Sequence, residues 1–395
     1  MSKYRYYENT TLSNRILDRS IVIGDTVKFR AGASQSSCVD PLRGILYTIY
    51  LTSRAFFGEP IDTVALNIMP ILQPHLSRDV IIVEHDMEMD GVIYKRNLIS
   101  QVLFTSHKKV RTLFMARHSD DREYDPTCAI YYRDYDPETN SLSGIQPVLC
   151  HTDSGLLPLT VELYASYMRE RGFEDYWLDG EKEEMLIMPI YRHHDFWYSC
   201  LTSRHSYPVF WKSVDDCATV EFTGIIPNKS KYECMHTIAK DTLYCLLRGG
   251  EGSNYYLSHD FGRTFVPGDK MVPLWETRSK LLTYRDKVLM AYSVYDLKPN
   301  LVRNGRNNIV FVWGEGGDES QYDQLLFLLH PLGMVHYEII NYKDTLYLIF
   351  STAELFLDID SDPNAASRHG PLKNAKDMMR FTRIGMFDEN GKLLF

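Results

Sequence analysis

The sequence is poor in cysteine and contains no long apolar segment. Only seven of its 395 residues are cysteine, and none belongs to a C-x-x-C pair of the kind that binds metals or exchanges disulfides. We therefore expect buried, reduced thiols instead of a disulfide framework. No uninterrupted apolar run approaches the roughly 20 residues of a membrane-spanning helix, so we expect no partnership with a membrane.

The chain also lacks an excess of basic residues. It carries 43 Lys and Arg against 52 Asp and Glu, which gives a formal net charge of −9. Proteins that bind the phosphate backbone of nucleic acids depend on clustered basic side chains, so nucleic acid is not an expected partner. Any anionic ligand must be held by a local group of cations.

Neither a signal peptide nor a linker is found in the sequence. The first residues lack the basic start, the apolar stretch and the small-residue cleavage site of a leader, which together with the scattered cysteines predicts a cytoplasmic protein. No proline-rich or glycine-serine stretch divides the chain, so we expect a single domain over residues 1–395. A domain of this length requires an architecture that grows by adding modules.

The sequence is rich in residues that favour strands, including 27 Tyr and 18 Phe. Its recurring unit is an apolar or alternating run, a polar turn and a second run. Six such groups occur, at residues 44–51 with 61–68, 98–104 with 111–117 and 129–132, 185–191 with 197–202 and 209–212, 231–257, 279–284 with 288–292 and 308–313, and 334–341 with 345–351. The pattern favours a ring of small sheets, in which no sheet edge is left free.

Two further segments complete this prediction. The early strand at residues 20–27 has no neighbouring partner, and we expect it to close the ring against residues 379–387. Helical periodicity is clear only near residues 159–171, which we expect to be a short helical insertion packed outside the ring. The predicted fold is thus an all-β, six-bladed β-propeller.

One eight-residue motif supports this fold. Residues 258–265 read S-H-D-F-G-R-T-F, in which Asp260 can accept backbone hydrogen bonds, Gly262 can adopt a conformation that other residues resist, and Phe265 can serve as an apolar plug. The motif resembles the Asp box, S-x-D-x-G-x-T-W, of the sialidase and BNR-repeat proteins. An ordinary β-hairpin is the alternative, since the sequence holds only this one clear copy. The resemblance implies a sialidase-like propeller and marks the fold, not the activity.

The segment before this motif carries two candidate site residues. Residues 232–248 read Y-E-C-M-H-T-I-A-K-D-T-L-Y-C-L-L-R, which resembles the sialidase segment in which a glutamate opens one strand and an arginine ends the next. A hairpin that turns at Lys240 and Asp241 would return Glu233 and Arg248 to the same end of one blade. Glu233 could instead pair with a nearby lysine.

Three other segments extend the resemblance. The stretch F-R-A-G at residues 29–32, with Arg54 further on, resembles the F-R-I-P stretch and its strand pair, although A-G replaces I-P. R-N-G-R-N at residues 303–307 resembles an arginine-bearing entry to the next blade, and H-Y at residues 336–337 opens a strand where sialidases place their tyrosine nucleophile. The resemblance implies a carboxylate-binding triad of Arg30, Arg248 and Arg306, a nucleophile pair of Tyr337 and Glu233, and further substrate contacts from Arg54 and His336.

These residue types suit the implied chemistry. A guanidinium matches a carboxylate bidentately and stays charged, so three of them can hold an anionic sugar in a net-acidic protein. A neutral tyrosine attacks a carbon that already bears a carboxylate with less repulsion than a second carboxylate would meet, and Glu233 would take the phenolic proton. We therefore predict a glycosidase that releases sialic acid or a related ulosonic acid, and we expect no cofactor.

The sequence departs from the family at the acid/base residue. Sialidases carry an aspartate in the loop before an I-D-T-V-like strand, whereas the loop at residues 55–60 has phenylalanine there. Glu59 or Asp62 could take that role. This departure leaves two alternatives open. One is a lyase for uronic-acid sugars that uses His236, His336 or Tyr337 as the base, and the other is a sugar-binding propeller without catalysis.

The adjacent histidines His193 and His194 could suggest a metal site. Neighbouring residues on a strand point to opposite faces, which prevents both imidazoles from binding one ion. We therefore expect these histidines to lie at the rim of the pocket or to pack against the protein, and we expect no metal.

Overall fold

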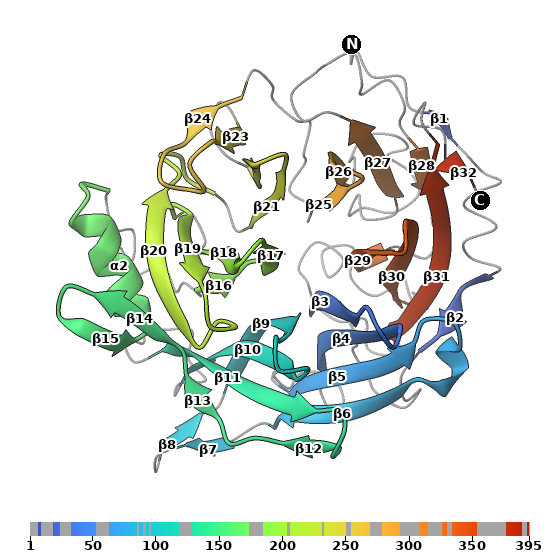
Figure 1. Ribbon diagram of the computed structural model, residues 1–395, viewed down its shortest axis with the longest axis horizontal. Helices are drawn as coiled ribbons and strands as arrows, with labels where there is room; N and C mark the ends of the chain where they lie inside the picture. Colours follow the sequence, from blue (N-terminus) through green and yellow to red (C-terminus); the bar gives the residue numbers. More distant parts are fainter. Residues whose placement is uncertain are drawn as a thin grey trace, which may run out of the picture.

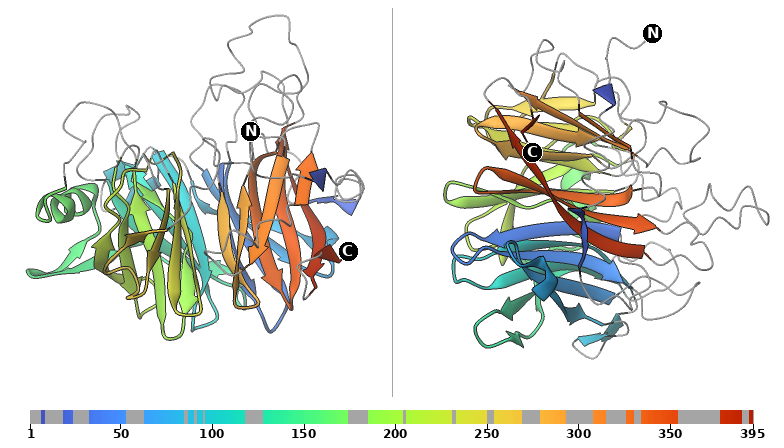
Figure 2. Two further views of the ribbon diagram at one scale, coloured as in Figure 1. Left: turned by 90° about the horizontal axis from the view of Figure 1, so that it is seen from above. Right: turned by 90° about the vertical axis from the view of Figure 1, so that its right-hand side faces the viewer.

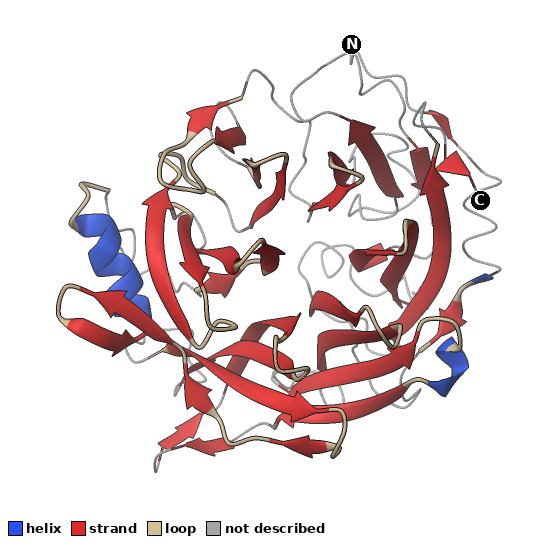
Figure 3. Cartoon of the chain, viewed as in Figure 1, coloured by secondary structure: helices blue, strands red, loops and turns tan. Residues whose placement is uncertain are grey.

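The described chain forms a ring of β-sheets around a common centre (Figure 1). The computed structural model describes residues 7–8, 19–23, 33–52, 63–84, 87–89, 92–94, 96–117, 128–173, 185–203, 206–230, 233–249, 254–268, 279–292, 308–314, 326–329, 334–353, 377–388 and 393–394. Within these residues there are six sheets of four or more strands and a separate two-stranded sheet. Figure 3 shows that strands dominate and that helices lie only at the periphery. The prediction of an all-β propeller is confirmed.

The first three blades come from the first part of the described chain. Blade 1 contains β3 (Ala33–Asp40), β4 (Ile45–Thr52), β5 (Thr63–Pro70) and β6 (Arg78–Val83), followed by the pair β7 (Met87–Met89) and β8 (Val92–Tyr94). Blade 2 contains β9 (Arg96–Phe104), β10 (Val110–Arg117), β11 (Ala129–Asp136), β12 (Ser141–Leu142) and β13 (Gln146–Pro147). Blade 3 contains β14 (Leu149–Thr152), β15 (Gly155–Pro158), β16 (Leu186–Ile187), β17 (Tyr191–His193), β18 (Phe196–Thr202), β19 (Val209–Ser213) and β20 (Thr219–Ile225).

The other three blades complete the ring. Blade 4 contains β21 (Cys234–Ala239), β22 (Thr242–Leu247), β23 (Tyr255–Ser258) and β24 (Val266–Pro267). Blade 5 contains β25 (Lys280–Tyr284), β26 (Lys287–Tyr292), β27 (Asn308–Gly314), β28 (Leu326–Leu329) and β1 (Tyr7–Glu8). Blade 6 contains β29 (Met334–Tyr342), β30 (Thr345–Ala353), β31 (Asp377–Phe387), β2 (Ile21–Val22) and β32 (Leu393–Leu394).

Ring closure joins the two ends of the described chain. Strand β2 pairs antiparallel with β31, with Ile21 opposite Phe381, and the amide of Ile23 donates to the carbonyl oxygen of Met379 at 2.9 Å. The predicted closing strand is therefore confirmed for residues 21–23, while residues 24–27 lie outside the described part. Because the added strand covers an edge of blade 6, backbone groups there find partners within the sheet.

The apolar core lies between the blades. Each of five clusters of buried side chains joins neighbouring blades, so the strands between them are covered on both faces. Seven consecutive residues of β5 and all six residues of β21 are buried. This double burial explains why many strands read as apolar runs instead of alternating polar and apolar residues.

Tight turns join the first and second strands of the last three blades. Lys240–Asp241, Arg285–Asp286 and Lys343–Asp344 all have positive φ at both residues, between 47° and 60°. Two-residue turns of this kind match the right-handed twist of the strands they join. The same basic-acidic pair therefore recurs at one face of the disc, and Figure 2 shows the strands running between its two faces.

Helix α2 (Val161–Arg169) packs outside blade 3 (Figure 1). The hydroxyl of Thr160 caps its first turn by accepting from the amide of Leu163 at 3.1 Å. Its buried side chains join the apolar cluster of blades 2 and 3, and the Tyr164 hydroxyl donates to the Tyr207 carbonyl oxygen at 2.8 Å. The predicted helical insertion is confirmed. The short helix η1 (Pro74–Leu76) spans three residues, and no helix within the described ranges has the length and hydropathy to cross a bilayer.

The hairpin between β23 and β24 has the hydrogen bonds expected for Asp260. One carboxylate oxygen accepts from the amides of Arg263 and Thr264 at 3.2 and 2.9 Å, and the other accepts from the Thr264 hydroxyl at 2.6 Å. Burial raises the pKa of Asp260, but these hydrogen bonds outweigh it and hold the pKa below its usual value. Gly262 has φ +86°, and Phe265 packs against Phe210 at a ring-centroid distance of 5.0 Å.

Blade 3 contains a second hairpin of the same design. Ser213 donates to Asp215 at 2.8 Å, and Asp215 accepts from the amide and the hydroxyl of Thr219 at 2.9 and 2.8 Å. Cys217, with φ +65°, occupies the place of the glycine, and its amide donates to the Ser213 hydroxyl at 2.9 Å. The single copy recognised in the sequence therefore has a structural counterpart one blade earlier.

All seven cysteines are free thiols, as expected. Six are buried and Cys38 is partly buried. Burial raises the pKa of Cys150 to about 12, so this thiol is protonated and inert at neutral pH.

Candidate active site

Glu233 and Arg248 meet at one end of blade 4. Strand β21 begins directly after Glu233, and β22 ends directly before Arg248, with Cys234 paired to Leu247. The Arg248 amide donates to the carbonyl oxygen of Glu233 at 2.9 Å, and its guanidinium Nη1 donates to Glu233 Oε2 at 2.7 Å. The predicted hairpin is confirmed, and the carboxylate pairs with the arginine that the sequence placed beside it.

This ion pair is sheltered and anchored. The side chains of Glu233 and Arg248 are only 14% and 13% exposed. The Ser230 hydroxyl donates to the Glu233 carbonyl oxygen at 2.8 Å, and the Ser230 amide donates to Ser206 at 2.9 Å. Charge-assisted bonds in such shelter hold their geometry better than surface pairs do. The orientation of the guanidinium is therefore fixed before any ligand arrives.

Tyr337 lies at the seam between blades 5 and 6. It belongs to β29, next to a register shift in the pairing with β30, and is 4% exposed among apolar side chains that include Phe311 and Phe350. Its hydroxyl donates to the carbonyl oxygen of Ala291 at 3.0 Å. A hydroxyl in this position becomes a nucleophile only after it exchanges that hydrogen bond for one to a base.

A buried ion pair that sequence reasoning missed adjoins Tyr337. Lys280 opens β25, and its ammonium lies 2.5 Å from Glu338 Oε2, with side-chain exposures of 3% and 6%. Each is a charged residue at the start of an otherwise apolar run, in K-L-L-T-Y and Y-E-I-I. That contrast was the available signal, because charged side chains are seldom fully buried unless they are paired.

The other predicted site residues stay predictions. Arg30, Arg54, Glu59, Asp62 and Arg306 all lie outside the described residues. His336 belongs to β29, for which the structure describes the backbone at this position but not the side chain. The meeting of Arg248 with the two other arginines of the triad is therefore untested.

His236 was proposed as a lyase base, and the structure contradicts that role. It is fully buried between blades 3 and 4, where its ring packs against those of Tyr198 and Phe210, and its Nδ1 lies 3.3 Å from the carbonyl oxygen of Cys234. Burial, assisted by the charge of Lys280, lowers the pKa of His236 to about 4. A side chain with no exposed surface cannot reach a sugar.

The premise that His193 and His194 point to opposite faces is wrong, whereas the expectation of packing against the protein holds for His193, whose ring lies 5.7 Å from that of Phe196. The premise placed both residues on a strand, but β17 ends at His193, and His194 occupies a turn with φ +50°. The turn brings the two rings to the same side, with centroids 4.1 Å apart. Both histidines lie at the turn end of blade 3, away from Glu233, and so they do not line the candidate active site.

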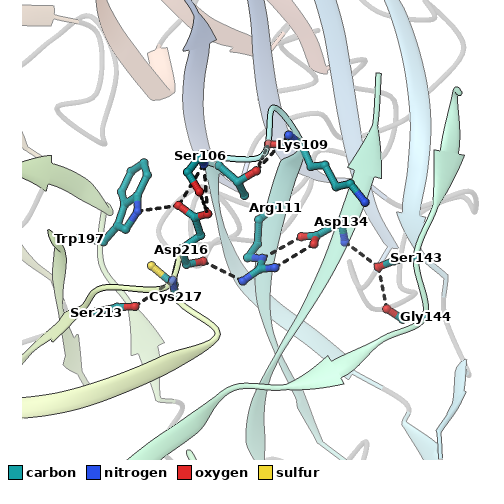
Figure 4. A network of polar contacts seen from close by, with 11 residues as sticks. Ser106, Lys109, Arg111, Asp134, Ser143, Gly144, Trp197, Ser213, Asp216 and Cys217 are labelled. Atoms are coloured by element: carbon teal, nitrogen blue, oxygen red, sulfur yellow. Dashed lines mark hydrogen bonds and ion pairs between the residues drawn. The ribbon is translucent and has the colours of Figure 1, made fainter. Parts of the chain in front are cut away.

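The guanidinium of Arg111 binds only protein groups through the hydrogen bonds drawn in Figure 4. Two of its nitrogens donate to Asp134 at 2.8 Å each, and the third donates to the carbonyl oxygen of Asp216 at 2.9 Å. Asp216 in turn accepts from the Ser106 hydroxyl at 2.6 Å and the Trp197 indole at 3.0 Å. The network joins blades 2 and 3, and every nitrogen of this guanidinium is engaged by the protein.

Comparison with known proteins supports the fold and leaves the activity open. No protein-family model and no curated protein match the sequence. Among solved structures, the chain is similar to a Trypanosoma rangeli sialidase (TM-score 0.55, 12% identity, 90% of this chain and 54% of that one), a Hadza microbial sialidase (0.58, 11%, 82% and 63%) and the NanB sialidase of Streptococcus pneumoniae (0.57, 10%, 92% and 70%). The chain thus spans less than two thirds of the length of the first two. At this level of identity the likeness concerns architecture: the chain has the β-propeller fold of solved sialidases.

Proposed function

We propose that the chain is a sialidase-like glycoside hydrolase that releases a terminal carboxylate-bearing sugar, sialic acid or a related ulosonic acid. The observation that carries the proposal is the sheltered Glu233–Arg248 pair, which a hairpin of a sialidase-type propeller holds at the ends of two adjacent strands. A solved Trypanosoma rangeli sialidase of similar fold contains sialic acid. An anionic sugar of this class is therefore the ligand to test first.

The proposed binding step depends on arginine. Pairing with Glu233 orients the guanidinium of Arg248, which presents a rigid fork of N–H donors suited to a carboxylate. The resemblance assigns Arg30 and Arg306 to the same carboxylate, with Arg54 and His336 as further substrate contacts. Local placement of these cations would allow a protein of net charge −9 to bind an anion.

In the proposed reaction, Tyr337 attacks the anomeric carbon. Its hydroxyl leaves the carbonyl oxygen of Ala291 and gives its proton to Glu233, while the bond from the anomeric carbon to the leaving oxygen breaks. Glu59 or Asp62 protonates the leaving oxygen. The same carboxylate then activates a water that displaces Tyr337, which recovers its proton from Glu233.

Removing one hydroxyl tests the nucleophile, and the chain offers a matched control. Tyr284 lies at the same seam between blades and is also buried, and its hydroxyl likewise donates to a backbone carbonyl, that of Asp344 at 2.8 Å. Tyr337→Phe and Tyr284→Phe should each lose about 1 kcal/mol of stability, the usual net value of one hydrogen bond. Only Tyr337→Phe should abolish release of a fluorescent aryl group from an aryl sialoside. Retained activity in that variant would remove Tyr337 from the nucleophile role.

The role of Arg248 is tested through the catalytic efficiency, kcat/KM. Arg248→Lys keeps the charge and loses the bidentate geometry, so kcat/KM for the aryl sialoside should fall by at least about tenfold, or roughly 1.4 kcal/mol. Arg43→Lys, at an exposed arginine that pairs with Glu138, should leave it unchanged. Equal kinetics for Arg248→Lys and the wild type would refute the proposed role of Arg248.

A binding propeller without catalysis is the second candidate. It is favoured by the buried position of Tyr337 and by the engagement of its hydroxyl with Ala291. Such a protein would bind the sugar, as calorimetry would detect, without releasing any aryl group. A lyase would instead yield an unsaturated product that absorbs in the ultraviolet, so one set of assays separates the three activities.

A further inference from the structure

His193, His194 and Asp241 form a compact group of possible metal ligands. The group lies on the face of the disc that carries the basic-acidic turns, one of which is Lys240–Asp241. The Nε2 atoms of His193 and His194 lie 3.2 and 3.6 Å from the same oxygen, Oδ1 of Asp241. One ligand atom from each residue lies within 4.8 Å of the other two. The histidines belong to blade 3 and the aspartate to blade 4, so the group spans the boundary between two blades.

Two turns bring these side chains together. His193 pairs with Phe196 at the end of the β17–β18 hairpin, which leaves His194 in the two-residue turn with φ +50°. Asp241 is the second residue of the turn between β21 and β22, with φ +60°. Non-glycine residues with positive φ are uncommon, and their side chains here converge on one point.

The separations match those between ligands of one metal ion. Zinc binds imidazole nitrogen and carboxylate oxygen at about 2.0–2.2 Å, and tetrahedral geometry then places two such donors about 3.3 Å apart. The observed 3.2 and 3.6 Å agree with this value. Each imidazole nitrogen can also share a proton with this carboxylate oxygen. A single divalent ion would replace the two shared protons.

One of the three residues packs against the protein, and the other two are exposed to solvent. The ring of His193 packs against Phe196 and Phe261, with centroids 5.7 and 5.4 Å away, and its side chain is 17% exposed. His194 and Asp241 are 71% and 73% exposed.

We propose that His193, His194 and Asp241 bind one divalent transition-metal ion of the zinc class and thereby link the turns of blades 3 and 4. Three protein ligands leave a fourth position for water, and two imidazoles with one carboxylate suit zinc better than calcium or magnesium, which prefer oxygen. Strand β21 separates Asp241 from Glu233 by about 20 Å. The proposal is therefore independent of the proposed sialidase activity.

The test is a zinc titration of the full chain without an affinity tag, after chelator treatment and dialysis. Calorimetry should show one zinc ion bound per chain, and zinc should raise the temperature of unfolding because it binds the folded state. Cobalt(II) provides a second readout, since tetrahedral binding gives a visible absorption band that zinc should displace.

Variants at exposed positions test the ligands without disturbing the core. His194→Ala and Asp241→Asn should each weaken zinc binding by at least about tenfold, because loss of even an outer-shell partner costs that much. They should also remove the zinc-dependent rise in unfolding temperature. His151→Ala deletes another exposed histidine of blade 3 and should change neither. A wild-type chain that binds no zinc, or a His194→Ala chain that binds it as tightly as the wild type, would overturn the proposal.

Discussion

The Arg111–Asp134 pair should contribute far more to stability than an exposed pair of the same chemistry. Both nitrogen–oxygen contacts are 2.8 Å, the side chains are 11% and 14% exposed, and the guanidinium lies 4.0 Å from the ring centre of Tyr132 (Figure 4). Asp134→Ala would leave the guanidinium of Arg111 sheltered from solvent. Of its hydrogen bonds in this network, only the one to the Asp216 carbonyl oxygen would remain. Breaking a buried pair costs about 3–5 kcal/mol, and this slight exposure places the expected loss near 3 kcal/mol.

The matched control is Glu138→Ala. Glu138 pairs with Arg43 at 3.0 Å, but the side chains are 62% and 46% exposed. Solvent screens such a pair, and its loss should cost less than about 1 kcal/mol. The two variants therefore remove the same kind of contact from opposite environments.

Urea unfolding followed by tryptophan fluorescence and circular dichroism measures both losses, with Arg111→Met and the Arg111→Met/Asp134→Leu double variant completing a cycle. The double variant should be more stable than Asp134→Ala, because no charge is left in shelter. Equal midpoints for Asp134→Ala and Glu138→Ala would refute the reasoning that shelter determines the strength of the pair.

Two further predictions concern pH and packing. His236 has a folded pKa of about 4 against 6.5 in the unfolded chain, so between these pH values only the unfolded state binds the extra proton. The contribution of His236 to stability should be complete above pH 6.5 and should fall by about 3 kcal/mol on acidification to pH 4. Unfolding midpoints compared across that range should therefore change less in His236→Gln than in the exposed control His75→Gln. An unchanged slope in His236→Gln would contradict the assigned pKa. A Cβ on Gly224 would lie 2.3 Å from the Gly262 carbonyl oxygen and 2.6 Å from that of Arg263, so Gly224→Ala should lower the free energy of unfolding by about 1–3 kcal/mol. Gly144→Ala, with 3.7 Å to its nearest neighbour, should leave it unchanged, and equal free energies of unfolding for the two variants would show that the contact between the blades relaxes to accept the methyl group.

The local sequence pattern was sufficient to predict the hairpins and their order along the chain. The Glu233–Arg248 hairpin follows from two apolar runs and the Lys240–Asp241 turn, because turn type and alternation together set the register of a short hairpin. The closing strand at residues 21–23 was predicted because an unpaired strand in an otherwise complete ring needs a partner. The hairpin at Ser213 escaped detection because Cys217 occupies the position where the motif has glycine, although the hydrogen bonds are the same.

The sequence by itself determined the strand pairs, the helix and the return of Glu233 and Arg248 to the same end of one blade, since each depends on residues close together in the chain. Only the tertiary structure decided the partners that cross between blades: the Ala291 carbonyl for Tyr337, Glu338 for Lys280, and Asp241 for the two histidines of blade 3. These contacts depend on how neighbouring sheets are rotated and spaced against each other. Residue periodicity within a strand carries no information on that arrangement, because it specifies which face is buried and not what covers it.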